Sequence, residues 1–231
     1  MTNLSDDFIE ETVEQEAIVD EDNQNSESQY RGSSTDPAFG FILAIALSVG
    51  LNALLPDNAD LRYSIAWGAL AFVGVLGWLL GSAERIGQER PENVVWGGAF
   101  GIMISVPFMI FFLPQFRAAS VLIFPEFGIG TVLAYLVFVM PLAETLFFRG
   151  SMQRHLDFWV VGLLAGLWNI ILFFPVMWSV LLDFVVVAIF LAIALVSLNL
   201  MYSYVRERNG LAAAWICQIV ASLILLFIPY L

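Results

Sequence analysis

Long apolar runs separated by short polar breaks make up the chain from Pro37 to its end. A helix needs about 20 residues to cross the hydrocarbon core of a bilayer, so each run is long enough for one membrane span. The breaks carry loop residues, as in PDNADLR and VRERNG. The pattern predicts an all-α polytopic bundle of about seven transmembrane helices, at approximately 38–55, 63–82, 94–113, 131–148, 158–176, 184–203 and 211–230.

The first 36 residues differ from the rest of the chain in charge. They hold 11 of the 21 acidic residues and a single arginine, and they lack the basic region and apolar core of a signal peptide. Such a segment buries too little apolar surface to fold alone, so we expect residues 1–36 to be a disordered acidic cytoplasmic tail and residues 37–231 to be the membrane domain. The alternative is a short acidic helix that docks on a partner through an apolar stripe, formed by Phe8, Ile9, Val13, Ala17 and Ile18.

Overall composition agrees with an integral membrane protein, since 60% of the residues are hydrophobic and the mean hydropathy is +0.83. The chain has no lysine and a net charge of −12. A salt-rich cytoplasm favours proteins of this composition, which suggests a halophilic archaeon. Phosphate-binding glycine loops and basic nucleic-acid patches are absent from the sequence, so we expect no nucleic-acid partner.

Arginine placement predicts how the bundle is oriented, because short cytoplasmic loops accumulate basic residues. With seven spans, the N-terminal side holds seven of the nine arginines. We therefore expect a multi-pass protein of the cell membrane with its N-terminus in the cytoplasm and its C-terminus outside. The fifth and sixth spans are separated by a short break, so Asp183 is expected at an interface or inside the membrane. The arginines on the N-terminal side are Arg31, Arg85, Arg90, Arg149, Arg154, Arg206 and Arg208, and those on the opposite side are Arg62 and Arg117.

Small and aromatic residues within the spans predict packing faces and interface anchors. Small residues four apart let helix backbones approach closely. Three tryptophans near the starts of predicted spans, Trp67, Trp96 and Trp159, fit the aromatic belts at membrane interfaces. The GxxxG spacings lie at Gly77 and Gly81, Gly97 and Gly101, and Gly162 and Gly166.

An acid and two amides fall inside the apolar runs at similar depth. With 1.5 Å of rise per residue, Glu144, Asn169 and Gln218 lie about 12–16 Å from the cytoplasmic ends of their spans. Ser222 is one turn beyond Gln218 on the same helix face. Because lipid cannot satisfy polar groups, these side chains are expected to face the interior or a wet cavity. They either line a functional cavity or hold the helices together by hydrogen bonds.

The stretch PLAETLFFRG, residues 141–150, resembles the EExxxR signature of the CAAX-protease and bacteriocin-processing (CPBP) family of intramembrane glutamate proteases, which includes the Rce1-type enzymes. RERNGLAAAWICQIVAS resembles the region of that family's last motif, HxxxN, and the likeness covers residues 131–225. In the family, the first glutamate activates water, a histidine in FxxxH assists it, and the HxxxN pair stabilises the oxyanion. The resemblance thus implies that Glu144 is the general base and that Arg149 is the motif arginine.

Five motif positions differ from the family pattern. Thr145 replaces the second glutamate, Asn169 stands for the FxxxH histidine with Ala165 in place of the phenylalanine, and Gln218 and Ser222 replace the HxxxN pair. Amides donate neutral hydrogen bonds but cannot take up a proton as histidine does. An acid-base group and an oxyanion donor are each worth about 100-fold in rate, so hydrolysis is expected to be lost or much reduced.

The motif arginine is expected to lose its partner as well. On an α-helix, a glutamate at 145 would lie one turn from Arg149, whereas Glu144 projects about 140° away. The only histidine, His155, falls in a basic interface segment, and one acid with two amides does not make a metal site. Cys217 has no activating neighbour in the sequence, which argues against a cysteine mechanism and leaves no cofactor to expect.

The sequence is compatible with three functions. The first is a non-catalytic CPBP relative that binds a membrane peptide, a prenylated protein or another partner in its cavity. The second is an active endopeptidase in which Glu144, Arg149, Asn169, Gln218 and Ser222 form an altered catalytic site. The third is a transporter or channel component in which Glu144 and Asp183 titrate.

Overall fold

The computed structural model describes residues 37–80, 90–178 and 185–231, which contain helices and no strands. The predicted all-α fold is thus confirmed for this part of the chain, while the acidic tail and Asp183 lie outside it. The helices are α2 (Pro37–Leu54), α3 (Ala59–Leu80), α4 (Pro91–Ile123), α5 (Ile129–Ala134), α6 (Met140–Glu144), α7 (Phe158–Phe173), α9 (Val185–Asn209), α10 (Leu211–Ser222) and α11 (Ile228–Tyr230). Three π-helical segments, η2 (Tyr135–Val139), η3 (Thr145–Ser151) and η5 (Leu223–Phe227), and one 3₁₀ turn, η4 (Met152–Arg154), join some of them.

Among the described residues, five helical stretches are long and apolar enough to cross a bilayer, which makes this a multi-pass membrane protein. They are Ala59–Gly77, Pro91–Ile123, Ile129–Arg154, Val185–Asn209 and Leu211–Tyr230. The other two predicted spans form shorter apolar helices, Ala38–Leu54 and Phe158–Phe173. In its described residues, each of the seven predicted runs is therefore mostly helical, but the count of seven spans is not confirmed.

The loop expected after residue 113 is wrong, because α4 continues to Ile123. Pro114 lacks the N–H that an unbroken helix needs, and the backbone is non-helical at Phe112, with φ −133° and ψ 25°. Beyond this kink, Phe116, Ala119 and Ile123 are buried at helical spacing, so an apolar face holds the second half of α4 against the bundle.

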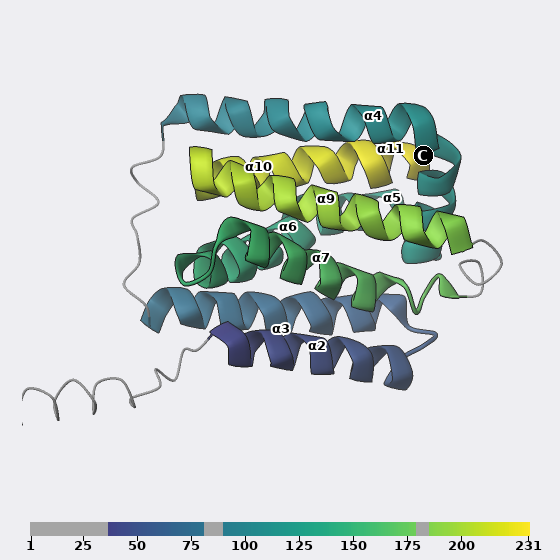
Figure 1. The fold of residues 1–231 in the computed structure, drawn as a ribbon. Helices are drawn as coiled ribbons and strands as arrows, with labels where there is room; N and C mark the ends of the chain where they lie inside the picture. Colours follow the sequence, from purple (N-terminus) through teal and green to yellow (C-terminus); the bar gives the residue numbers. More distant parts are fainter. Residues whose placement is uncertain (1–36, 81–89, 179–184) are drawn as a thin grey trace, which may run out of the picture. The chain divides into compact units, whose positions relative to one another are not determined.

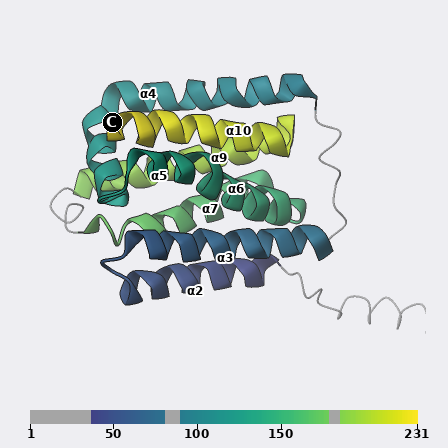
Figure 2. The same ribbon diagram turned by 180° about the vertical axis from the view of Figure 1, so that it is seen from behind.

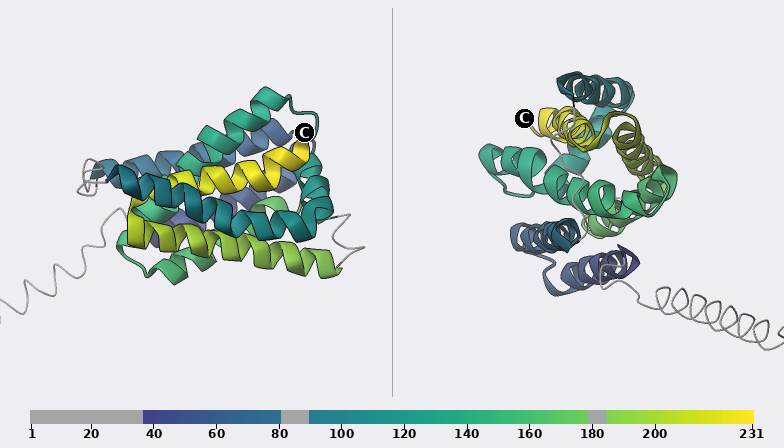
Figure 3. Two further views of the ribbon diagram at one scale, coloured as in Figure 1. Left: turned by 90° about the horizontal axis from the view of Figure 1, so that it is seen from above. Right: turned by 90° about the vertical axis from the view of Figure 1, so that its left-hand side faces the viewer.

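Within residues 37–231, the helices run side by side, with α2 and α3 at one edge and α4 beside α10 at the other (Figures 1 and 2). The continuous stretch from α5 to η4 enters the middle of this arrangement, where α6 and η3 contact both α3 and α10. Seen end-on, α7 and α9 lie next to each other between these edges (Figure 3, right). A side chain on α6 or η3 can therefore meet residues of several other helices.

Two of the predicted GxxxG packing faces are confirmed by close backbone approaches. A Cβ on Gly97 would overlap the carbonyl group of Ala213 on α10, and a Cβ on Gly162 would lie 2.8 Å from the Cα of Leu200 on α9. The small residues thus bring α4 onto α10 and α7 onto α9. The third pair includes Gly81, which lies outside the described residues.

The interface role predicted for Trp67 is wrong, because its side chain is 0% exposed. Tyr63, Trp67 and Leu70 are all buried, and their spacing of four and three residues places them on the inner face of α3. Trp96 and Trp159 are 57% and 51% exposed, so those two remain available to lipid. Trp67 instead points into the centre of the bundle, where it meets Glu144.

Candidate functional site

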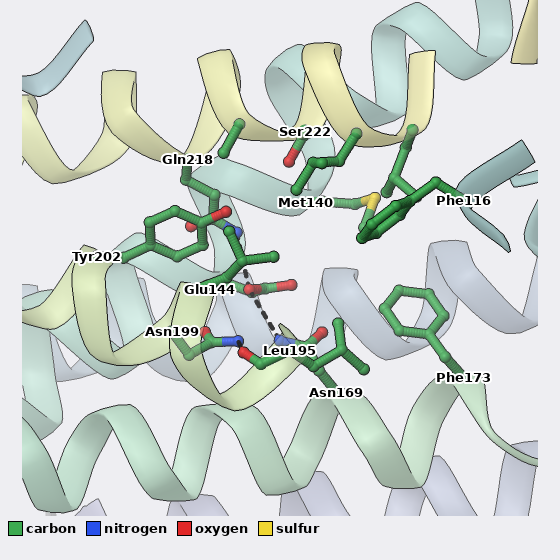
Figure 4. A pocket seen from close by; sticks show the side chains of 14 residues that line it. Phe116, Met140, Glu144, Asn169, Phe173, Leu195, Asn199, Tyr202, Gln218 and Ser222 are labelled. Carbon is green, nitrogen blue, oxygen red and sulfur yellow. Dashed lines mark hydrogen bonds between the residues drawn. The ribbon is translucent and has the colours of Figure 1, made fainter. Parts of the chain in front are cut away.

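Glu144, the last residue of α6, is 1% exposed and accepts hydrogen bonds from three other helices. Trp67 of α3 donates from Nε1 to Oε1 at 3.1 Å, and Gln218 of α10 donates from Nε2 to Oε2 at 2.8 Å. Asn169 of α7 donates from Nδ2 to Oε2 at 3.4 Å (Figure 4). The predicted convergence of Glu144, Asn169 and Gln218 in the bundle interior is confirmed.

The expectation that Glu144 projects away from Arg149 is wrong, since Nη1 of Arg149 lies 3.8 Å from Oε2 of Glu144. The reason is local helix geometry. Residues 145–151 form the π-helical segment η3, in which the hydrogen-bonded repeat joins residues five apart rather than four. Glu144 and Arg149 are five residues apart, so they share a face that an α-helix would not give them. Their side chains are 2% and 0% exposed, which makes this a buried ion pair.

Arg149 is held by further groups on α9 and α10. Its Nη2 donates to Oδ1 of Asn199 at 2.5 Å, and its Nη1 donates to Oε1 of Gln218 at 3.4 Å. The guanidinium carbon lies 5.3 Å from the ring centroid of Tyr202, within range of a cation–π contact. These contacts satisfy two of the three guanidinium nitrogens, while Nε has no hydrogen-bond partner among the described residues.

Gln218 bridges the two charges of this pair. Its amide nitrogen donates to Glu144, while its amide oxygen accepts from Arg149 and, at 3.4 Å, from the hydroxyl of Thr145. One amide can do both because it carries a donor and an acceptor side by side. Gln218 is therefore matched to both members of the ion pair.

A cavity of about 70 Å³ lies against this cluster, large enough for water molecules. Phe116 and Phe173 lie on one side of it (Figure 4). The polar residues that line it are Glu144, Asn169, Asn199, Tyr202, Gln218 and Ser222. Four of the five predicted site residues thus line one cavity. The fifth, Arg149, does not line it and instead lies behind the carboxylate.

Three residues of the cluster were missed or misassigned from the sequence. Asn199 interrupts the apolar run of α9, and Tyr202 is three residues beyond it on the same face. The rule that identified Asn169, a polar side chain deep in a span, would also have identified Asn199. Trp67 lies near the start of a predicted span, as interface tryptophans also do, so the sequence could not distinguish a buried tryptophan from an interface one.

The remaining reactive side chains lie apart from the cavity. His155 follows η4 and is exposed, and the free thiol of Cys217 is buried in α10 without lining the cavity. In the described ranges, no group of three or more His, Cys, Asp or Glu side chains is placed to hold a metal ion. The polar groups that line this cavity are therefore one carboxylate, three amides, the hydroxyl of Ser222 and the phenol of Tyr202.

Removing the indole N–H next to Glu144 tests how firmly the cluster holds the carboxylate. We expect Trp67→Phe to lower the free energy of unfolding by about 1.5–3 kcal/mol, the range for a hydrogen bond to a charged group. The measurement is an unfolding titration in detergent micelles. The matched control is Trp96→Phe, whose exposed indole makes no contact with Glu144 and whose loss is expected to change stability by less than about 0.5 kcal/mol. Equal effects of the two substitutions would contradict a role for the Trp67 N–H.

No protein-family model, no curated protein and no solved structure matches this chain. What the structure itself shows is that Arg149, Asn169, Gln218 and Ser222, from η3, α7 and α10, lie around Glu144 of α6.

Proposed function

We propose that this chain is an intramembrane binding protein of the CPBP type, in which the polar cavity holds part of a membrane peptide and hydrolysis is lost or much reduced. One observation carries the proposal. Both oxygens of Glu144 already accept hydrogen bonds from the protein's own side chains, and Arg149 lies behind them. The groups that touch the carboxylate are amides, an indole and a guanidinium, none of which passes a proton to and fro as histidine does.

The rest of the cavity supports binding rather than hydrolysis. Splitting an amide requires a group that returns a proton to the leaving nitrogen and donors that stabilise a developing negative charge. Here the amide nitrogens of Asn169 and Gln218 are directed at Glu144, and that of Asn199 donates to the Leu195 carbonyl. One N–H of each of these amides is thus engaged with the protein itself and is not available to an oxyanion.

A second candidate, a glutamate endopeptidase with an altered site, is favoured by one specific observation. Within the described part of the chain, Oε1 of Glu144 accepts from Trp67 alone, while a carboxylate oxygen has room for a further hydrogen bond. Glu144 also lines a cavity that can hold water. A water molecule bound to Oε1 would be placed for activation by the carboxylate.

The proposed orientation in the cell membrane keeps the N-terminus in the cytoplasm and counts α2 and α7 among seven spans. Arg90 at the start of α4, Arg154 in η4 and Arg208 near the end of α9 support it, because these elements end on one side of the bundle. Arg62 and Arg117 lie on α3 and α4 towards the opposite side. This division follows the positive-inside rule.

Binding and cleavage can be measured together on one probe. The probe is an apolar transmembrane reporter peptide with a central glycine-rich break, labelled with a fluorophore and a quencher on either side of it. The protein is held in lipid nanodiscs at high salt. We expect the reporter to bind, and to remain uncut by the wild-type protein and by Glu144→Gln. Cleavage that disappears in Glu144→Gln but persists in Glu92→Gln, a change of an exposed acid, would instead favour the endopeptidase.

The place of binding is tested by Ser222→Ala. This hydroxyl lines the cavity and has no hydrogen bond to the described part of the chain, so its removal leaves the cluster intact. Loss of one ligand hydrogen bond is expected to weaken reporter binding about 5- to 10-fold. Ser197→Ala, on α9 outside the cavity lining, serves as the control. Absence of binding to the wild-type protein, or equal binding by both serine variants, would contradict the proposal.

A further inference from the structure

The backbone of α3 lies directly against the π-helical segment η3 at Gly74. A Cβ added to this glycine would be 2.9 Å from the backbone nitrogen of Phe147 and 3.1 Å from the carbonyl carbon of Leu146. Both atoms belong to η3, whose last turn is closed by a bond from the N–H of Met152 to the carbonyl of Phe147, five residues earlier. A larger residue at 74 would push on a backbone rather than on a movable side chain, so the close approach depends on glycine.

Polar contacts hold η3 on its other side. Arg149 reaches Asn199 of α9 and Gln218 of α10, and the hydroxyl of Thr145 also donates to Gln218. The segment therefore lies between α3 and α10, both of which it contacts (Figure 2). Its backbone cannot move away from α3 without disturbing the contacts of Arg149.

The room between these neighbours matters because a π-helical turn is wider than an α-helical one, its hydrogen-bonded ring enclosing an extra residue. Such segments are rare and mostly limited to single turns, so one that spans Thr145–Ser151 depends on the space that its neighbours leave. At Gly74 that space comes from the missing side chain. A methyl group at this position would leave room for the narrower α-helical turn alone.

From these contacts we infer that Gly74 is a positioning residue for the buried ion pair. By admitting the wide turn of η3, it keeps Glu144 and Arg149, five residues apart, on one helix face. With an α-helical repeat the arginine would point about 140° away from the glutamate. Gly74 does not line the cavity, so it acts on Glu144 through Arg149. Because the ion pair exists without any ligand, this role goes beyond the proposed function and does not depend on it.

The charge of the cavity wall thus depends on a contact outside the cavity. While η3 keeps the π-helical repeat, Arg149 lies behind the carboxylate of Glu144 and offsets its charge. If the repeat changes, that carboxylate lines the cavity without its counter-charge, which is costly in a buried position. The separation of α3 from η3 therefore controls the electrostatics of the site.

The test measures the coupling between Glu144 and Arg149 in the unfolding equilibrium of the protein in detergent micelles. Four proteins, with and without Glu144→Gln and Arg149→Leu, form a double-mutant cycle. We expect a coupling of at least about 5-fold in the unfolding equilibrium constant with glycine at 74, and of less than about 2-fold when Gly74→Ala is present in all four. A substitution that merely destabilises the fold shifts the four proteins alike, so it leaves the coupling unchanged.

Deleting Leu146, which is only partly buried, supplies the converse test. The deletion takes the extra residue out of η3 and leaves Glu144 and Arg149 four positions apart, a spacing that an α-helix places on one face. In the Gly74→Ala protein we expect this deletion to restore the coupling to at least about 5-fold. If Gly74→Ala alone does not fold, as judged by its unfolding curve, the deletion variant decides: a restored coupling supports the role of Gly74, and its absence overturns it.

Two other glycines of α3 provide matched controls. A methyl group on Gly77 would lie 2.8 Å from the hydroxyl oxygen of Ser151, which can rotate aside. One on Gly68 would meet nothing within 4 Å outside its own helix in the described parts of the chain. Gly77→Ala and Gly68→Ala are therefore expected to leave the Glu144–Arg149 coupling at its full value.

A second coupling in the same variant separates a change of helical repeat from a general displacement. Trp67 of α3 donates to Glu144, which precedes η3, so the coupling between these two residues, measured with Trp67→Phe, should persist in Gly74→Ala. Loss of the Trp67 coupling together with that of Arg149 overturns the inference, since Glu144 would then have moved as a whole.

Survival of the Glu144–Arg149 coupling in a folded Gly74→Ala protein also overturns the inference. The contacts of Arg149 with α9 and α10 would then hold the helical repeat by themselves. None of these measurements uses the reporter peptide, so the role of Gly74 and the binding of a peptide stand or fail separately.

Discussion

Replacing Arg149 by leucine is expected to lower the free energy of unfolding by about 3–5 kcal/mol, because it leaves the carboxylate of Glu144 buried without a counter-charge. Both side chains are almost fully buried, and no second cation lies within 4 Å of Glu144 among the described residues. Asn199 would also lose the donor to its side-chain oxygen. An unfolding titration of the protein in mixed detergent micelles measures the effect.

A second substitution distinguishes the uncompensated charge from simple loss of packing. In the Arg149→Leu background, Glu144→Gln removes the buried charge and is expected to restore a large part of the lost stability, although the same change alone is destabilising. The double-mutant cycle then gives a coupling energy of at least about 1 kcal/mol. Arg117→Leu, an exposed arginine on α4, is the control and should have an effect within about 0.5 kcal/mol. A cost below about 1 kcal/mol for Arg149→Leu would contradict a structural ion pair.

The convergence of Glu144, Asn169 and Gln218 could be predicted from the sequence because it follows from solvation alone. Lipid offers no hydrogen bonds, so polar side chains at membrane depth turn inward whatever the details of packing. Their depths agreed to within about one helical turn, which was enough to place them together. The same rule explains why Asn199 belongs to the cluster.

The pairing of Glu144 with Arg149 could not be predicted, because it depends on a helix period that the sequence pattern does not display. At the 3.6 residues per turn of an α-helix, the two side chains would project in different directions. The wider turn of the π-helical segment η3 places them on the same face. The continuation of α4 past Pro114 was missed for a related reason. A proline predicts a break, yet the apolar spacing from Phe116 to Ile123 is strong enough to restart the helix after one kink.

Restoring the family's chemical groups should create proteolytic activity where the proposed pseudoenzyme has little. We expect the triple variant Thr145→Glu, Asn169→His and Gln218→His to cleave the reporter at least about 100-fold faster than the wild-type protein, since proton transfer and oxyanion stabilisation each contribute about that much or more. The hydroxyl of Thr145 and Nη1 of Arg149 already meet at one atom, Oε1 of Gln218. A glutamate at 145 is therefore close enough to accept a hydrogen bond from Arg149 in place of Gln218.

That exchange is the reason for changing three positions together. Gln218→His alone removes the acceptor that Arg149 uses, whereas the new carboxylate at 145 replaces that acceptor and frees Glu144 to bind water. The control is the triple variant carrying Glu144→Gln, which should return to the wild-type rate if Glu144 is the base. His155→Ala in the triple variant should change nothing, because that histidine is exposed and does not line the cavity. A folded triple variant without Glu144-dependent cleavage would contradict the view that these three replacements account for most of the lost activity.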